Sequence, residues 1–353
     1  MRKYRNRILT GIAIAFVIYV VLLLFINTDD LLSQLAAYPW ELLIPVILLK
    51  FLAWVFRFLE WQYYLGVIDA RDKISLFDSA VLYLSGYTMA VSPGKIAEVL
   101  KAVILKVKTG IPVARSAPVV IAERVVDGVA VVVVAFITAL VAGQAIDLGG
   151  YGVLLALSGV LLAIGLAAVQ IRPLAYFFLD IVARMPFVKR LYHPLVAFYE
   201  SSTEVLKLRH VLPTSALGAA AHLSDAFGFT IMLSGFGLEI TWPLFLQATF
   251  IVGIAAAIGA LSGIPNGAGI TEVGTKEMLV AIVGPANPAI IPVAATAALM
   301  EGFFHKWFRV FFGMMVGLIF RHRLFTPSVE ETLVEMETER TQKRAYAPES
   351  SLV

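Results

Sequence analysis

The chain has 353 residues, of which 59% are hydrophobic and 15% are charged, and its formal net charge is +3. Because soluble domains are about half apolar, this composition excludes a soluble globular fold and indicates an all-α polytopic integral membrane protein. The small net charge argues against nucleic acid as a partner, and the lack of cysteine excludes disulfides, thiol nucleophiles and thiolate metal sites.

The first apolar run, residues 8–26, follows four basic residues and is long enough to cross a bilayer. The segment Asn27-Thr28-Asp29-Asp30 after it lacks the small residues of a signal-peptide cleavage site and continues into an acidic loop. We therefore expect a membrane anchor with a cytoplasmic N-terminus. A second span, residues 42–66, returns the chain to the basic stretch Arg71–Lys73 on the same side.

The next apolar segment, residues 76–105, is interrupted at its middle by Pro93-Gly94. Basic residues lie near both of its ends, and basic residues mark the cytoplasmic side of a membrane protein. An apolar segment that begins and ends on one side, with a helix breaker halfway, predicts a re-entrant helical hairpin.

Three further segments are apolar and long enough to be spans: residues 117–141, 151–170 and 211–236. Between the second and third of these, residues 172–209 interleave aromatic and basic side chains and contain Pro186 and Pro194. This pattern predicts interfacial helices on the inner membrane face.

A second interrupted segment, residues 243–284, contains Pro265 and several glycines at its middle. The loops on both sides of it lack Lys and Arg, so this hairpin is predicted to enter from outside. A last span, residues 289–320, leads back to basic residues on the inside. Residues 326–353 then form a polar cytoplasmic tail that is predicted to be disordered.

These elements predict one membrane domain over residues 1–325, with six transmembrane helices and two oppositely oriented re-entrant hairpins in an inverted repeat. Glu98 and Glu272 follow the two Gly/Pro turns and are separated by about half the chain, as are Glu123 and Glu301. Broken helices at corresponding positions of two halves are typical of the substrate site of a transporter.

Ionisable residues recur inside the predicted spans and hairpins, where each costs about 2.5–3.5 kcal/mol at a helix centre. Either they pair with one another in salt bridges between helices, or they line a water-accessible cavity, which is the interpretation that we favour. Glu301 and His305 are four positions apart and share a helix face. The candidate substrate-binding residues are Lys95, Glu98, Glu123, Arg124, Asp127, Gly267, Gly269, Glu272, Glu301, His305, Lys306 and Arg309.

Lys306 and Arg309 share one face of the last span, and two cations so placed require an anion, for which a lipid phosphate is suited. Gly267 and Gly269 precede a half-helix and would let backbone N–H groups point into the cavity, where the helix dipole favours anions. The alternative is that these glycines serve only the geometry of a tight turn.

Arg124 and Asp127 are three positions apart and can pair on one helix face. His222 and Asp225 are interpreted as a proton-coupling pair, because a histidine in a polar cavity titrates near neutrality. Metal-binding motifs such as HExxH do not occur, so we expect neither a metal nor a cofactor.

The runs Pro93-Gly94-Lys95-Ile96-Ala97-Glu98-Val99-Leu100-Lys101, Ala122-Glu123-Arg124-Val125-Val126-Asp127 and Pro265 to Glu272 are similar to motifs of the lysylphosphatidylglycerol synthase transmembrane (flippase-like) family. The resemblance covers nearly the whole membrane portion, and the Glu-Arg-x-x-Asp element is its most specific part. It implies lipid translocation across a bilayer. By the same resemblance, the site residues are Glu98, Glu123, Arg124, Asp127, Gly267 and Glu272.

Two features depart from the family pattern. Lys95 stands where the family more often has a Gly-Glu pair, and no soluble aminoacyl-transfer or glycosyltransferase domain is attached. The second departure leads us to expect that the protein does not aminoacylate lipids.

We therefore expect a flippase, and not an enzyme, for an anionic phospholipid or polyprenyl-phosphate-linked lipid in the cell membrane, with both termini in the cytoplasm. One alternative is an intramembrane lipid-modifying enzyme with Glu98 or Glu272 as general base. Another is a membrane scaffold that transports nothing. If the first hypothesis holds, Arg124 and Lys306 are expected to hold the lipid phosphate.

Overall fold

The computed structural model describes residues 27–89, 99–143, 150–184 and 202–324, with a few positions beyond them. In these residues the regular structure is entirely helical, without a strand. Five of the described segments are long and apolar enough to cross a membrane: Trp40–Val67, Arg115–Ala142, Leu208–Ser234, Trp242–Leu261 and Pro288–Ile319. The chain is thus an all-helical, multi-pass membrane protein, as its composition predicts.

Helices follow one another along the described part of the chain. The α-helices are α2 (Thr28–Ala37), α3 (Leu43–Val67), α4 (Leu76–Met89), α5 (Val99–Thr109), α6 (Val113–Ala142), α7 (Tyr151–Gln170), α8 (Arg172–Arg184), α10 (Leu208–Ser234), α11 (Trp242–Leu261), α12 (Ile270–Met278), α13 (Ala294–Gly302), α14 (Phe308–Ile319) and α15 (Arg321–Leu324). Short 3-10 helices are η1 (Trp40–Leu42), η2 (Arg71–Lys73), η6 (Pro265–Gly267) and η8 (Pro288–Val293). Two π-helical turns, η7 (Leu279–Val283) and η9 (Phe303–Trp307), continue α12 and join α13 to α14.

Most predicted elements coincide with described helices. Helices α3, α6, α7 and α10 lie over the predicted spans 42–66, 117–141, 151–170 and 211–236, and η8 to α14 lie over 289–320. Other predictions fall mainly on residues outside the described set: the first span, the turn of the first hairpin with Lys95 and Glu98, much of the interfacial segment after α8, and the tail. Helix α8 itself occupies the start of the predicted interfacial segment and exposes Phe177 and Phe178.

Helix α2 occupies a segment that was expected to be a loop. Its N-cap is Asn27, whose side chain accepts a hydrogen bond from the Asp29 backbone N–H at 3.1 Å, and two aspartates lie in its first turn. Both features stabilise a helix N-terminus. Gln34 then fixes α2 to η8 by donating to the carbonyl of Pro292 at 3.2 Å.

Helices α11 and α12 form the second predicted hairpin and are joined by the turn around η6. At Gly267 φ is +62°, and an added Cβ would lie 2.9 Å from the backbone of Gly259, so glycine lets the turn lie directly against α11. The first arm, α11, has 20 residues, which is enough to cross a membrane by itself. It is therefore longer than the half-membrane arm that the interrupted segment suggested.

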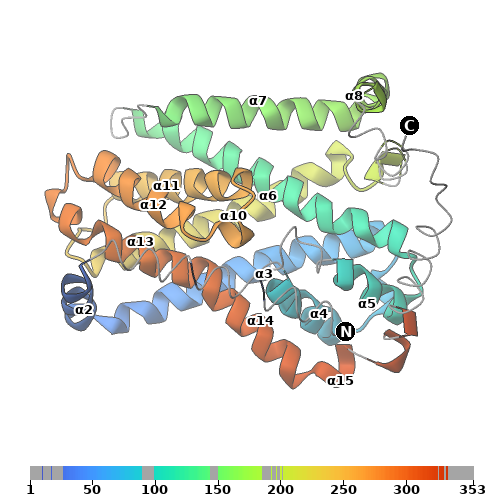
Figure 1. Cartoon of the computed structure of the whole chain (residues 1–353), viewed down its shortest axis with the longest axis horizontal. Helices are drawn as coiled ribbons and strands as arrows, with labels where there is room; N and C mark the ends of the chain where they lie inside the picture. The colour runs from blue at the N-terminus through green and yellow to red at the C-terminus, as the bar shows by residue number, and fades with distance from the viewer. Residues whose placement is uncertain are drawn as a thin grey trace, which may run out of the picture.

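The two helix pairs lie at opposite ends of the molecule. In Figure 1 the α11/α12 pair lies toward the left and the α4/α5 pair toward the right, while α3 and α10 run along the long axis between them. Each pair packs on a long helix from the other half of the chain, because α4 lies along α14 and α11 lies along α6. Helices α3 and α10 pack along each other at the centre.

Charge distinguishes the two ends. At the α8 end, Asp78 of α4 pairs with Lys108 of α5 and Arg323 of α15. In the connection before α10, hydrogen bonds from Lys207 and Arg209 lower the pKa of Glu204 to about 2. In the described parts of the connections at the α2 end, acidic residues occur without any Lys or Arg.

Two apolar clusters form the core, one toward each end. The first centres on Val46, Phe229 and Phe250, and the second on Trp61 and Leu82. On α3, the buried Lys50 lies between Val46 of the first cluster and Trp54 of the second. Its charge is therefore held at the middle of the helix with apolar packing on both sides.

Candidate functional site

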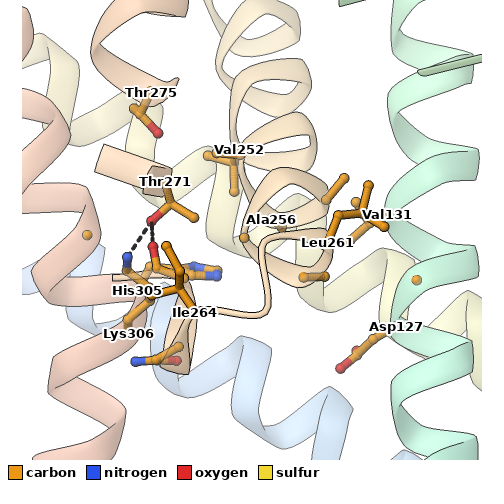
Figure 2. A pocket seen from close by; sticks show the side chains of 18 of the residues that line it. Asp127, Val131, Val252, Ala256, Leu261, Ile264, Thr271, Thr275, His305 and Lys306 are labelled. Atoms are coloured by element: carbon orange, nitrogen blue, oxygen red, sulfur yellow. Dashed lines mark hydrogen bonds between the residues drawn. The ribbon is translucent and has the colours of Figure 1, made fainter. Parts of the chain in front are cut away.

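A cavity of about 660 Å³ lies between α6, α7, α11, the turn before α12 and the helices α13 and α14. Its volume is that of a typical small-molecule site. Figure 2 shows Asp127 and Val131 on α6 across from His305 and Lys306, with Ile264 of the turn between them. Charged side chains therefore face the cavity from both sides, and apolar ones such as Val131 lie beside them.

Most of the predicted site residues line this cavity: Arg124, Asp127, Gly267, Glu272, Glu301, His305, Lys306 and Arg309. They come from distant parts of the chain, on α6, the turn, α12 and the α13–α14 helix. Glu123, Gly269, His222 and Asp225 are not on the cavity wall. Lys95 and Glu98 lie outside the described residues.

Asp127 is shared by two guanidinium groups. It accepts a hydrogen bond from Arg124 Nη1 at 3.4 Å, which is the predicted pair on one helix face, and a shorter one from Arg57 Nη1 of α3. Sequence reasoning gave Arg57 no role in the site. Its position seven residues after Lys50, on the same face of α3, could have indicated that both point into the protein.

Lys306 has an internal partner. Its Nζ atom lies 2.5 Å from Glu272 Oε1. It also donates to Thr271 Oγ1, and a dashed line in Figure 2 marks this hydrogen bond. Lys306 and Glu272 are 5% and 4% exposed. The charge that was expected to attract a lipid phosphate is thus neutralised by a carboxylate from the second hairpin.

The N-terminus of α12 is already occupied by a carboxylate of the chain itself, that of Glu272. Gly269 N–H donates to Glu272 Oε2 at 2.8 Å, and Gly267 N–H donates to the carbonyl of Ile264 at 2.9 Å. Because the Glu272 side chain caps its own helix, the two glycine N–H groups do not point freely into the cavity.

Arg309 lies on the cavity wall without a carboxylate. Its Nη2 atom donates to Asn266 Oδ1 at 3.3 Å, and its guanidinium lies 5.9 Å from the centre of the Tyr87 ring. Arg57 and Arg124 are close enough to repel it. Among the residues that the structure describes, no Asp or Glu lies within ion-pair distance of Arg309.

A buried charge cluster borders the cavity. Lys50 Nζ lies 3.3 Å from Asp225 Oδ1 and 3.2 Å from Glu301 Oε1. His305 Nδ1 lies 3.5 Å from the same Glu301 oxygen. Sequence reasoning recognised Lys50 as a charge inside a span but did not place it in the site.

The predicted proton-coupling pair is divided between two environments. Asp225 faces Lys50, whereas His222 Nε2 lies 3.3 Å from the carbonyl oxygen of Thr249 on α11. None of the hydrogen bonds described for these two side chains joins them to each other.

Glu123 has a different environment from the rest of its motif. Its carboxylate accepts hydrogen bonds from Lys101 Nζ at 2.9 and 3.2 Å, and that ammonium lies 3.6 Å from the centre of the Trp61 ring. This buried ion pair, with its cation–π contact, holds α5 against α6 away from the cavity. The arrangement indicates a structural contribution of Glu123.

A comparison of the sequence with family models identifies the family of the chain. A model of the lysylphosphatidylglycerol synthase TM region matches residues 8–313, which is most of the chain. The chain belongs to this family. No curated protein and no solved structure gave a match. Membership of the lysylphosphatidylglycerol synthase TM family confirms the predicted family and indicates a function related to membrane lipids.

Proposed function

We propose that this protein moves a lipid with an anionic headgroup across the bilayer. The observation that carries the proposal is the cationic wall of the cavity, where Arg57, Arg124 and Arg309 lie close together and Asp127 is the carboxylate between them. Guanidinium groups bind phosphate through paired hydrogen bonds, and an anion would relieve their mutual repulsion.

The remaining lining of the cavity suits the apolar part of a lipid. Aliphatic side chains of α6, α7 and α11 form it: Val131, Val132, Leu161, Leu162, Val252 and Leu261. A ligand with both a phosphate and hydrocarbon would match both parts of the lining. This mixed lining favours a lipid over a small soluble anion.

We infer transport by alternating access, with the six spans and two re-entrant hairpins that the sequence predicts. The α4/α5 and α11/α12 pairs at opposite ends pack on equivalent long helices of the other half, as an inverted repeat requires. Lys50 of α3 and Asp225 of α10, which occupy corresponding positions of the two halves, meet at the centre. Rocking of one half against the other would expose the central cavity to each side in turn.

The orientation follows from the charge of the two ends. The basic α8 end faces the cytoplasm in this proposal, and the acidic α2 end faces outward. A location in the cell membrane with both termini in the cytoplasm is part of the same proposal.

The enzyme alternative has less support from the described residues. A general base needs a free oxygen near the substrate, but the Glu272 oxygens are engaged by Lys306, Thr271 and the Gly269 N–H. Glu98 lies outside the described residues.

Purified protein in liposomes tests the proposal. The probe is phosphatidylglycerol with a fluorescent label on one acyl chain, and its exposure is followed by a quencher that does not cross the membrane. We expect transbilayer movement of this lipid and much slower movement of labelled phosphatidylcholine. Covalently altered lipid without transbilayer movement would contradict the proposal and support the enzyme.

Arg309→Gln gives the residue-level test. The transport rate should fall roughly ten- to hundredfold, because a charge-assisted hydrogen bond is worth about 1.5–3 kcal/mol. Lys276→Gln is the matched control, since Lys276 is exposed on α12 and pairs with the adjacent Glu277. Equal rates for Arg309→Gln and the control would remove the phosphate-binding assignment.

A further inference from the structure

Lys50, Asp225, Glu301 and His305 form a buried charge cluster beside the cavity. Lys50 lies between the two carboxylates, and all three side chains come from different helices, α3, α10 and α13. Their exposures are 1%, 4% and 5%, so water contributes little to balancing their charges. With one ammonium and two carboxylates, the ionised cluster has a net negative charge.

Burying an uncompensated charge costs several kcal/mol, so a further positive charge within the cluster would stabilise it. The charged and titratable groups on the elements around it are Arg57, His222, Glu272, Lys306 and Arg309. Arg57 is bound to Asp127, and Lys306 is bound to Glu272. His222 contacts a backbone carbonyl, and Arg309 contacts Asn266. Among the described residues, only Lys50 and His305 lie within ion-pair distance of Asp225 or Glu301.

Two atoms of the cluster are open to a proton. Glu301 Oε2 and His305 Nδ1 are buried and have no hydrogen-bond partner in the described part of the chain, although both residues line the cavity. His305 Nδ1 lies 3.5 Å from Glu301 Oε1 and 3.7 Å from Asp225 Oδ2. A proton on either Glu301 or His305 would supply the missing charge and a missing hydrogen bond.

We propose that this cluster takes up one proton from the cavity, held by Glu301 and His305, and that the proton and the anionic lipid bind and cross together. This inference rests on the proposed transport of lipid. His305 and Arg309 are four positions apart and both line the cavity, so a phosphate at Arg309 lies near the protonated cluster. Each ligand then strengthens binding of the other by the same factor.

A proton fits the cluster better than a metal cation. The Lys50 ammonium already occupies the space between the two carboxylates, and no group of three or more His, Asp or Glu among the described residues has the arrangement of a metal site. A sodium ion remains the other monovalent ligand, and the experiment separates the two.

The test imposes a pH gradient on proteoliposomes while potassium and valinomycin hold the membrane potential at zero. The readout is the ratio of transport rates of labelled phosphatidylglycerol with and without the gradient. For one pH unit, acidic on the donor side, the wild-type ratio should be between about three and ten, because one pH unit corresponds to a tenfold change in proton activity. A sodium gradient of equal size should leave the ratio near one.

Two variants test the residues. Glu301→Gln mimics the protonated acid and should bring the ratio to about one, whatever its rate without a gradient, and His305→Gln should lower it. Glu277→Gln is the control, because Glu277 is exposed on α12 and should keep the wild-type ratio. A full pH response in Glu301→Gln, or a wild-type response to sodium in place of protons, would overturn the proton assignment.

Failure of coupling and failure of transport give different results. Lipid movement that ignores the pH gradient in the wild type would overturn the coupling and leave the proposed function intact. If the wild type moves no lipid, infrared difference spectra across a pH titration decide whether the cluster binds a proton. A carboxylic-acid band that titrates and is lost in Glu301→Gln would support the proton site, and its absence would overturn it.

Discussion

At Gly302, the lack of a side chain lets α13 approach the buried carboxylate of Glu272. A Cβ atom at this position would overlap Glu272 Oε1, which is the oxygen that binds Lys306. The carboxylate cannot move away without losing this ion pair or its hydrogen bond from Gly269. Glycine is therefore required at this position to keep α13 and Glu272 in place at the cavity.

We predict that Gly302→Ala destabilises the protein by about 1–3 kcal/mol, the usual cost of overpacking a well-packed interior. Thermal unfolding in detergent, followed by size-exclusion chromatography, measures the effect. Gly165→Ala is the matched control, because it also lies within a helix but has open space around its Cα. Equal unfolding temperatures for the two variants would show that the close approach of α13 is not required.

At the scale of elements, the second hairpin is attached to the last long helix through buried charges. Lys306 lies in the π-helical turn η9, and Glu272 lies in the first turn of α12. A π-helical turn rotates the residues after it relative to an α-helix and is often found at functional sites. The turn thus helps to direct Lys306 toward the hairpin while Arg309 faces the cavity.

We predict that Lys306→Met destabilises the protein by about 3–5 kcal/mol, because it leaves Glu272 buried without its cation. Adding Glu272→Gln should recover part of this loss, since the double variant buries no uncompensated carboxylate. The four proteins form a double-mutant cycle that is measured by thermal unfolding. Additive effects of the two substitutions would mean that the ion pair does not hold the hairpin.

At the scale of the whole molecule, the distribution of charge along the long axis sets the expected orientation. The connection before α4 contains Arg71 and Lys73, whereas the connection between α10 and α11 contains Glu239 and no Lys or Arg. Helices α3 and α10 end at opposite ends of the molecule (Figure 1). Sites in these two connections should therefore lie on opposite sides of the membrane.

The natural chain has no cysteine, so single cysteines report position directly. We predict that Asp72→Cys reacts with a membrane-impermeant maleimide only from the cytoplasmic side, and that Glu239→Cys reacts only from outside. Both positions are exposed. Labelling of both cysteines from one side of intact cells would contradict the proposed topology.

The composition of this protein decides its class and the approximate positions of most of its described helices, because the apolar length that a helix needs to span a membrane is a local property of the chain. The family motif was also visible locally, with Arg124 and Asp127 on one helix face. Most candidate residues lie around one cavity, and several of them also pair in salt bridges between helices, which was the alternative interpretation. The helix α2 was missed, although its N-cap Asn27 and the aspartates after it were visible in the sequence.

Only the tertiary structure decides which charges meet. Asp127 binds Arg57 as well as its local neighbour, Lys306 binds Glu272, and Lys50 lies between two carboxylates of other helices. Each of these pairs joins helices that are far apart in the sequence, and a sequence without an alignment shows which charges are buried but not which helix faces pack together. The combination of cationic and apolar side chains around one cavity depends on that packing.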